Sequence, residues 1–264
     1  MSDTLPAGID ISKPNIARIY DYWLGGKDNF AVDREQAELS LELCPSLRQW
    51  ARDNRSFVCG AAARAAREAG IRQFLDLGAG LPTHPAVHEA VRSVDPSARV
   101  AYVDFDGVAV LHAQALLATT QGLTAVRGDV ADYDAVLAEV ADTIDLSRPT
   151  AVLMAGVLHF LPVQRAREVC AGWISRMAPG SWLVLAVGRY EDHALLDRLR
   201  TVYSAAEYFN HSPEEFASFF SGPDLSSTDI VPPGISEGRR WLAGVSAPLP
   251  GHDVYVLCGA AVKR

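Results

Sequence analysis

Residues 71–80 read IRQFLDLGAG, a short apolar run that ends in an acidic residue and a turn with two glycines. The run predicts a buried strand over residues 71–78. After Asp76 the chain turns through Gly78-Ala79-Gly80, where glycine permits a tight turn and a close approach of backbone to a ligand. A single Gly-x-Gly is weak evidence, and by itself it predicts a turn and nothing more.

The residues after this turn alternate between apolar runs and helical patterns. Alternation of this kind predicts a parallel sheet with helices on both faces. Further strands are expected at 98–106, 123–129, 149–156 and 180–188, and helices at 84–94, 107–119, 132–143 and 163–177. The stretches 225–235 and 252–264 are expected to add a closing antiparallel pair, which makes seven strands.

Helical signals dominate the first 70 residues and return near residue 212. One helix is expected from Asp33 to Cys44, and a longer one after Ser46 that ends at Gly70. Later in the chain, Ser212 suits an N-cap position and Pro213 the first helical position, and Glu215 suits the reciprocal capping role. Three aromatic residues of this later helix share one face: Phe216, Phe219 and Phe220.

Composition narrows the class of protein. The chain has 264 residues, of which 49% are hydrophobic, and this is enough for a sizeable core. Its net charge is −8, which is unfavourable for nucleic-acid binding because that needs basic residues. No apolar run is long enough to span a membrane, and the start lacks the pattern of a secretion signal. The chain has four cysteines, Cys44, Cys59, Cys170 and Cys258. Because none of them forms a Cys-x-x-Cys pair, neither a zinc site nor a redox pair is predicted. A cytoplasmic location is expected.

Acidic residues stand at the ends of three consecutive predicted strands: Asp76, Asp104 and Asp129. Because the carboxyl ends of parallel strands meet at one edge of a sheet, these side chains are expected to converge where ligands bind. Asp104 suits the ribose hydroxyls of a nucleoside, and Asp129 suits an adenine amino group.

The type of nucleoside follows from two phosphate-binding motifs that the sequence lacks. A dinucleotide fold has a third glycine that lets the helix N-terminus meet pyrophosphate, but Leu81 and Pro82 follow Gly80 here. The Lys-Ser/Thr of a Walker motif is also absent. S-adenosylmethionine (SAM) carries no phosphate and needs a cradle for its methionine part, an acid for its ribose and a polar contact for its adenine. The pattern therefore predicts SAM as the cofactor.

Residues 74–80, 100–106 and 127–130 resemble the successive motifs of class I SAM-dependent methyltransferases. Four longer segments resemble a largely uncharacterised bacterial family of such enzymes: ARIYDYWLGGKDNFAVDRE (17–35), FLDLGAGLPT (74–83), AYVDFD (101–106) and AVLMAGVLHFLP (151–162). The resemblance covers nearly the whole chain. It departs at Gly107, where the family often has proline, and at AVGRYEDH (186–193), where a Ser-His pair is common. The second departure faces the substrate side of this fold, so an altered substrate or altered chemistry is left open.

The resemblance implies an α/β, Rossmann-like, seven-stranded sheet with its final strand antiparallel and an N-terminal helical cap. Residues 1–70 would cover the pocket of a SAM-binding domain at 71–264, the two forming one structural unit. Residues 20–30 would then fold over SAM, although Tyr22, Trp23 and Phe30 are read first as core anchors of a docked helix. The implied cofactor-binding residues are Tyr20, Gly25, Gly26, Asn29, Asp76, Gly78, Ala79, Gly80, Asp104, Phe105, Asp129, Val130 and Ala155.

His159 follows the fourth predicted strand and is the candidate catalytic base or substrate contact; the alternative is packing against the sheet edge. No metal site is predicted, because His84 and His88 lack a carboxylate cluster. Asp192 and His193 lie on the substrate side, where surface placement is equally expected. Phe216, Phe219 and Phe220, together with Trp241, are read either as core or as an apolar wall for the acceptor.

The predicted function is methyl transfer from SAM to a small molecule by in-line displacement in a pocket that excludes water. One alternative is a SAM-binding protein that uses the pocket for cyclisation, rearrangement or regulation, and another is a non-catalytic interaction protein that kept the fold. No nucleic-acid or membrane partner is expected. The acceptor and the oligomeric state, a homodimer included, are left open.

Overall fold

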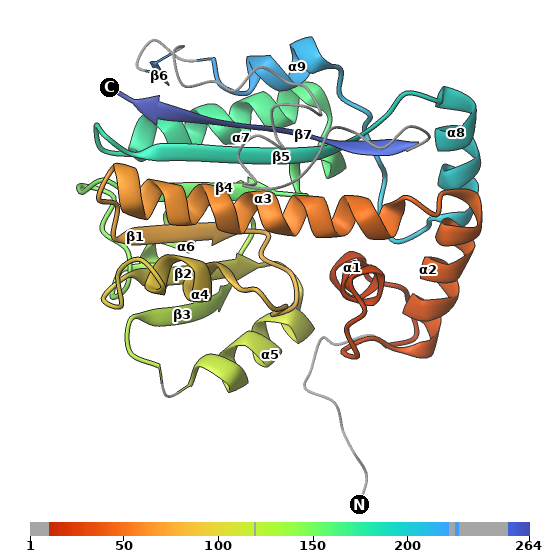
Figure 1. Ribbon diagram of the computed structural model, residues 1–264, viewed down its shortest axis with the longest axis horizontal. Helices are drawn as coiled ribbons and strands as arrows, with labels where there is room; N and C mark the ends of the chain where they lie inside the picture. Colours follow the sequence, from red (N-terminus) through yellow and green to blue (C-terminus); the bar gives the residue numbers. More distant parts are fainter. Residues whose placement is uncertain (1–10, 119, 222–224, 227–252) are drawn as a thin grey trace, which may run out of the picture.

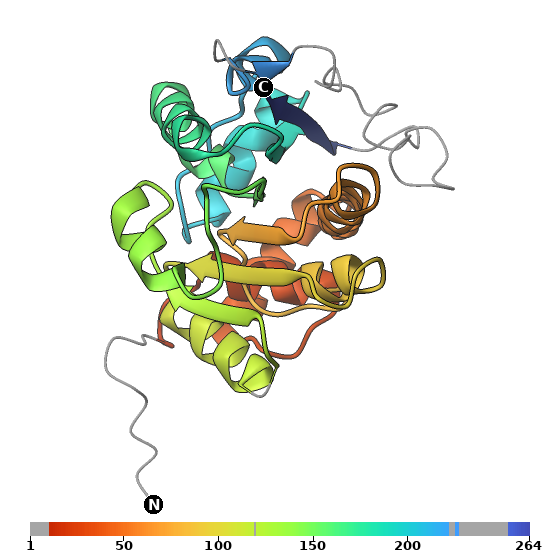
Figure 2. The ribbon, with the colours of Figure 1, turned by 90° about the vertical axis from the view of Figure 1, so that its left-hand side faces the viewer.

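A computed structural model describes residues 11–118, 120–221, 225–226 and 253–264. The core of the molecule is a mixed sheet with helices on both faces, as the sequence predicts (Figures 1 and 2). Its strands are β1 (Gln73–Leu77), β2 (Arg99–Asp104), β3 (Leu123–Arg127), β4 (Ala151–Ala155), β5 (Trp182–Tyr190), β6 (Leu225–Ser226) and β7 (Val254–Lys263).

The strands lie in the order β3-β2-β1-β4-β5-β7-β6. The first five are parallel, and β7 runs antiparallel to β5 along nine residue pairs from Trp182↔Val262 to Tyr190↔Val254. Six strands of ordinary length therefore make a mostly parallel sheet. The segment β6 adds only two residues at the outer edge of β7. The rest of the strand expected at 225–235, like Trp241, lies outside the described residues.

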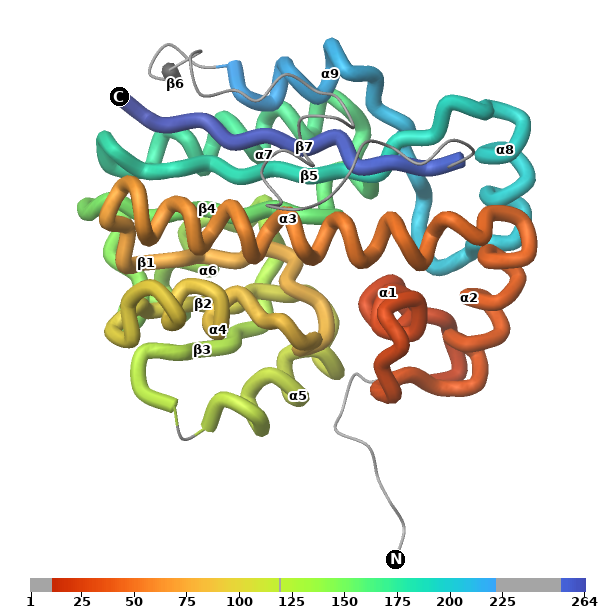
Figure 3. The backbone as a smooth tube through the Cα atoms, in the orientation of Figure 1, coloured from red at the N-terminus to blue at the C-terminus, as the bar shows by residue number. Residues whose placement is uncertain are grey.

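Most helices lie on the two faces of this sheet, whereas α1, α2 and α8 lie beyond the ends of its strands (Figure 3). Their bounds are α1 (Ile16–Leu24), α2 (Ala31–Leu43), α3 (Leu47–Glu68), α4 (Val87–Arg92), α5 (Gly107–Leu117), α6 (Tyr133–Val140), η1 (Leu158–Phe160, a 3-10 turn), α7 (Val163–Arg176), α8 (His193–Val202) and α9 (Pro213–Ser218). The predicted capping box is present at α9, where Ser212 and Glu215 bond each other's backbone N–H. Helix α4 is shorter than expected, because it begins only after Pro85.

Two hydrophobic clusters hold the helices against the sheet. Helices α3, α4 and α5 pack on one face, where Phe57 and Phe74 are fully buried. Helices α6, α7 and α9 pack on the other, around Trp173. The aromatic residues of α9, Phe216, Phe219 and Phe220, belong to this second core. Burial of apolar surface of this extent is the main force that stabilises such layers.

A third cluster lies beyond the carboxyl end of β5. Ile19 and Trp23 of α1 meet α2, the N-terminal part of α3, and α8. Helix α3 thus joins two cores: its C-terminal part lies on the sheet face, and its N-terminal part lies with α1 and α2 (Figure 1). This arrangement places α1 at the sheet edge where the acidic residues of β1–β3 converge.

No helix in the described part of the chain combines the length and apolar character needed to cross a bilayer.

Candidate functional site

A cavity of about 490 Å³ lies at the carboxyl ends of the strands. It is lined by the ends of β1 to β4, by α1, α3, η1 and α8, and by residues 203–208. Its size is in the range of small-molecule sites, and a crevice at the switch point between β1 and β4 is where open α/β sheets bind ligands. The predicted site residues that line it are Tyr20, Asp76, Gly78, Ala79, Gly80, Asp104, Phe105, Asp129, Val130, Ala155 and His159.

The glycine turn forms one wall of the cavity. Gly78 and Gly80 have φ angles of 72° and 66°, in the region that favours glycine. A Cβ at Gly78 would overlap the side chain of Val157, and a Cβ at Gly80 would meet that of Ala17 in α1 at 3.8 Å. The turn therefore offers bare backbone to the cavity.

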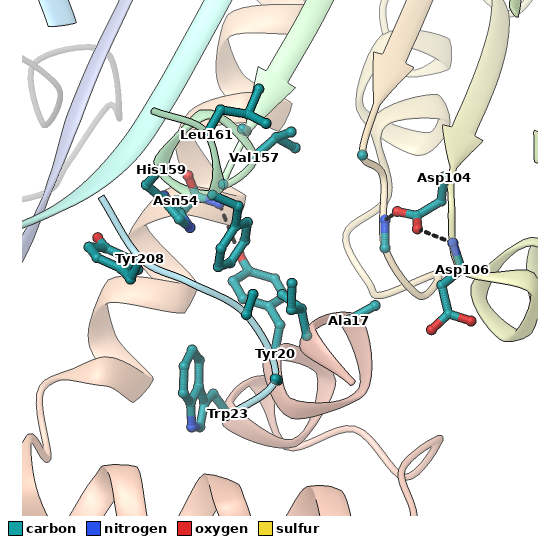
Figure 4. A pocket seen from close by; sticks show the side chains of 18 of the residues that line it. Ala17, Tyr20, Trp23, Asn54, Asp104, Asp106, Val157, His159, Leu161 and Tyr208 are labelled. Carbon is teal, nitrogen blue, oxygen red and sulfur yellow. Dashed lines mark hydrogen bonds between the residues drawn. The ribbon is translucent and has the colours of Figure 1, made fainter. Parts of the chain in front are cut away.

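Asp104 holds this turn in place from the neighbouring strand. Its carboxylate accepts hydrogen bonds from the backbone N–H of Gly80 at 2.7 Å and of Asp106 at 2.9 Å (Figure 4). Burial raises the pKa of Asp104, and these two backbone bonds oppose that shift. Both of its oxygens are already engaged by the turn and the start of α5.

Asp106 is a cavity residue that the sequence analysis missed. It is the N-cap of α5, with Oδ1 accepting from the N–H of Val108 at 2.6 Å, while its buried Oδ2 has no hydrogen-bond partner. Helix capping explains one oxygen, and the unpaired oxygen at a cavity wall points to a ligand group. The sequence signal is an acid directly before the helix-starting Gly107.

Asp76 is the most strongly perturbed acid of the site. Burial raises its pKa to about 6, opposed by the guanidinium of Arg55 and assisted by the charge of Asp104. Its Oδ2 is buried without a partner. Arg55, also missed from the sequence, donates to the carbonyls of Thr83 at 3.1 Å and Pro85 at 2.9 Å. A buried, unpaired carboxylate oxygen beside a cavity suits a cationic ligand group.

Phe105 and Asp129 lie at the open end of the site. The Phe105 ring is 59% exposed, which is unusual for an aromatic residue beside a cavity. Asp129 accepts from the N–H of Ala131 at 2.8 Å and is otherwise exposed. An exposed aromatic ring and an exposed carboxylate thus line the same cavity.

The family model described as S-adenosyl methyltransferase matches residues 2–264. The chain belongs to this family. It is a SAM-dependent methyltransferase, and SAM is its methyl donor.

Two solved structures of similar sequence agree with this assignment. A protein of Thermobifida fusca YX, provisionally described as a methyltransferase, is 34% identical with a TM-score of 0.87, and the match covers all of both chains. A DUF574 family protein of Streptomyces avermitilis MA-4680 is 32% identical with a TM-score of 0.82, and the match covers 97% of this chain and 99% of that one. Mitomycin 7-O-methyltransferase MmcR, 16% identical with a TM-score of 0.51 over 94% of this chain and 68% of its own, shares the fold.

The residues of the cavity fit SAM. SAM has a cationic ammonium, a ribose with two hydroxyls and a flat adenine. The cavity offers two unpaired carboxylate oxygens, on Asp76 and Asp106, a bare glycine turn and an exposed ring at Phe105. The chemistry of the wall therefore matches the methyl donor of the family.

Three predicted cofactor residues of this methyltransferase lie outside the cavity lining: Gly25, Gly26 and Asn29. Gly25 ends α1 with a φ of 86°, and Gly26 lies so close to the Asp21 carboxylate that a Cβ would overlap it. Asn29 donates to Asp21 Oδ2 at 2.9 Å and to the carbonyl of Gly26 at 3.1 Å. These contacts make a loop around a buried carboxylate, so both glycines have a structural explanation here.

A buried ion pair completes the N-terminal frame. Arg18 Nε donates to Asp33 Oδ2 at 2.8 Å, with both side chains almost fully buried. Asp33 also accepts from the N–H of Asn15 at 2.9 Å and of Phe30 at 2.8 Å. This frame presents α1 to the cavity, where Tyr20 and Trp23 line the wall while Tyr22 and Phe30 do not.

His159 lies in the cavity wall but is poorly placed to act as a base. Its Nδ1 accepts from the N–H of Gly188 at 3.2 Å, so the proton of the neutral ring is on Nε2. Burial, assisted by His211, lowers the pKa of His159 to about 3. Its ring stacks on Tyr208 with centroids 4.8 Å apart. The other ring nitrogen, Nε2, is therefore a hydrogen-bond donor.

Proposed function

We propose that the chain transfers the methyl group of SAM to a small molecule bound in the same cavity. The observation that carries this proposal is one continuous cavity with two different walls. Figure 4 shows Asp104 and Asp106 on one side and His159, Tyr208 and Trp23 on the other. The acidic side suits the cofactor, and the aromatic side suits an apolar acceptor.

In this proposal Asp76 binds the ammonium of SAM and the turn at Gly78–Gly80 holds its methionine chain. Asp104 and Asp106 receive the ribose, Asp104 chiefly by positioning the turn and Asp106 through its unpaired Oδ2. Phe105 and Asp129 receive the adenine, with Val130 and Ala155 as neighbouring contacts. Hydrogen bonds from a ligand to buried unpaired acceptors would be worth more than equivalent bonds at the surface.

Helices of residues 1–70 would act as the cover of this pocket. Ala17 of α1 lies next to Gly80, and Tyr20 donates to the carbonyl of Ala51 at 2.9 Å in α3. The cover would exclude water and hold the acceptor in line with the transferred methyl group, which is most of what this chemistry requires.

Calorimetry and product analysis test the proposal together. We expect SAM and S-adenosylhomocysteine to bind to the purified chain, and S-adenosylhomocysteine to form from SAM when an extract of small metabolites is added. Asp106→Asn should weaken SAM binding, while Asp132→Asn, which alters a helix N-cap outside the cavity lining, should not. Binding without turnover in any extract would favour non-methylating use of the pocket, and no binding would refute the site.

A further inference from the structure

The second wall of the cavity is a chamber of aromatic rings, named here the ring chamber. Its members are Tyr20, Trp23, Trp50, Phe160, Tyr190, Tyr203 and Tyr208. Trp23 stacks on Tyr203 with an interplanar angle of 26° and meets Trp50 edge-on at 6.2 Å. Leu161, directly after η1, and Leu196 and Leu199 of α8 also line the cavity. A wall of this kind binds flat apolar molecules by stacking and edge contacts.

Charge is distributed unevenly around the cavity. The acids among its described lining residues are Asp76, Asp104, Asp106 and Asp129, all from the strand ends β1–β3 and the turns that follow them. The cations of the described lining are Arg55 and Arg200. Arg200 lies near the ring chamber but already contacts Asp197 at 3.0 Å and the carbonyl of Tyr208 at 3.0 Å. The ring chamber thus contributes no carboxylate to bind an ammonium group.

The ring chamber also lacks a proton acceptor among its described residues. His159 Nδ1 is occupied by the N–H of Gly188, and its Nε2 carries the proton. His211, whose Nε2 donates to the Leu158 carbonyl, is not among the residues that line the cavity. Burial raises the pKa values of Tyr190, Tyr203 and Tyr208, so these hydroxyls stay protonated at neutral pH.

The hydroxyl of Tyr20 donates to the carbonyl of Ala51 and accepts from the side-chain amide of Asn54. Burial raises the pKa of Tyr20 to about 12, so this hydroxyl also stays protonated at neutral pH. Asp76 Oδ2 is unpaired, and the proposed function assigns it to the ammonium of SAM. A substrate hydroxyl in the ring chamber would find donors, ring faces and the unpaired amide oxygen of Asn54. That oxygen can accept a hydrogen bond, but an amide is not basic enough to take a proton.

This inference rests on the proposed function and names its substrate class. We propose that the acceptor is a flat aromatic molecule whose attacking hydroxyl ionises by itself near neutral pH, as when it is conjugated to a ring carbonyl. The oxyanion forms a bond to the methyl carbon while the carbon–sulfur bond of SAM breaks, and the electron pair of that bond remains on sulfur. No proton moves in this step, so no protein base is needed. His159 Nε2–H is a donor to the acceptor's oxygen.

Three ring systems of matched size test the proposal: lawsone, whose hydroxyl is conjugated to a quinone carbonyl, naphthol, and naphthylmethylamine. S-adenosylhomocysteine formation and the mass of the methylated product are measured, with calorimetric binding of each probe to the S-adenosylhomocysteine complex as a second readout. At about pH 7 we expect lawsone to react at least about tenfold faster than naphthol, because the hydroxyl of naphthol ionises only near pH ~10, as that of tyrosine does. We expect naphthylmethylamine to bind most weakly of the three.

The pH dependence distinguishes self-ionisation from base catalysis. The naphthol rate should rise roughly tenfold per pH unit, because the ionised fraction grows by that factor below the pKa. His159→Asn keeps an acceptor for Gly188 N–H and should show the same slope as the unaltered chain. A naphthol rate that does not change with pH in the unaltered chain, or a slope that appears only in the variant, would identify His159 as a base and overturn the proposal.

Two further variants test the place of binding. Trp23→Leu should weaken lawsone binding about fivefold and leave S-adenosylhomocysteine binding unchanged, since a stacked ring is worth about 1 kcal/mol. Phe216→Leu, in the core on the far face, should change neither. Preferred binding of the amine, or failure of all three probes to bind or react in a chain that binds SAM, would refute the acceptor class. Failure to bind SAM would instead refute the proposed function.

Discussion

Replacing Asp76 with asparagine should make the SAM-free protein more stable while weakening its hold on SAM. Asp76 is fully buried at the end of β1, and its Oδ2 has no hydrogen-bond partner. Asparagine has nearly the same shape and carries no charge, so the substitution removes the cost of a buried charge without opening a cavity. The opposite effects on stability and binding are what a ligand-binding acid predicts.

The size of this gain in stability follows from the shifted pKa of Asp76. Burial raises the pKa of Asp76 from 3.8 to about 6, with the opposing attraction of Arg55 already included. Two pKa units correspond to about 3 kcal/mol, at about 1.4 kcal/mol per unit. Because the folded state binds the proton more tightly than the unfolded state, the folded protein loses stability as pH rises from 3.8 towards 6, and the whole cost remains above pH 6. Asp76→Asn should therefore gain up to about 3 kcal/mol at pH 7, less than about 2 at pH 5 and nothing below pH 4.

Urea unfolding of both proteins at these pH values measures the gain, and calorimetry measures SAM binding. The unaltered chain should bind SAM with an affinity that falls below pH 6, because Asp76 must lose its proton to hold the ammonium. The variant should bind roughly ten- to a hundredfold more weakly, since hydrogen bonds to charged groups are worth about 1.5–3 kcal/mol, and without that pH dependence. A variant that is less stable at pH 7, or one that binds SAM as the unaltered chain does, would contradict this account of Asp76.

Three other substitutions test the N-terminal frame, the proposed adenine contact and the ring chamber one at a time. Asp33→Ala should lower the free energy of unfolding by about 3–5 kcal/mol in urea, because it leaves Arg18 buried without its partner; a loss under about 1 kcal/mol would mean that the pair is not needed. Phe105→Ala should weaken SAM binding by about 1–3 kcal/mol in calorimetry, as expected for a lost base stack, with the melting temperature unchanged because the ring is 59% exposed. Tyr208→Phe removes a buried hydroxyl that has no partner, so thermal unfolding should show equal or slightly higher stability, and a clear loss would reveal a bond to that hydroxyl.

Much of the architecture could be predicted from local patterns. The five parallel strands, the capping box at Ser212 and the glycine turn all depend on residues that are neighbours in the chain. The convergence of Asp76, Asp104 and Asp129 could be predicted too, because parallel strands bring their carboxyl ends to the same edge. The starts of the helices were less predictable, since α4 begins three residues later than its pattern indicates.

The part played by residues 20–30 could not be read from their pattern. Glycines beside aromatic residues suit either a cofactor contact or a loop built on itself. Only the position of the Asp21 carboxylate, which Asn29 bonds and which leaves no room for a Cβ at Gly26, distinguishes the two. The same stretch also contributes Tyr20 and Trp23 to the cavity, so its two halves have different roles.

By itself, the sequence determined the sheet, the glycine turn and the class of cofactor, since these follow from periodicity and from which residue ends each strand. The tertiary structure decided what each polar group can do. It left Asp76 and Asp106 with unpaired oxygens, and it turned His159 from a candidate base into a donor through Gly188, 29 residues away. It also assembled the ring chamber from α1, α3, η1, β5 and residues 203–208. Proton affinity and hydrogen-bond direction depend on neighbours in space, which a local pattern does not contain.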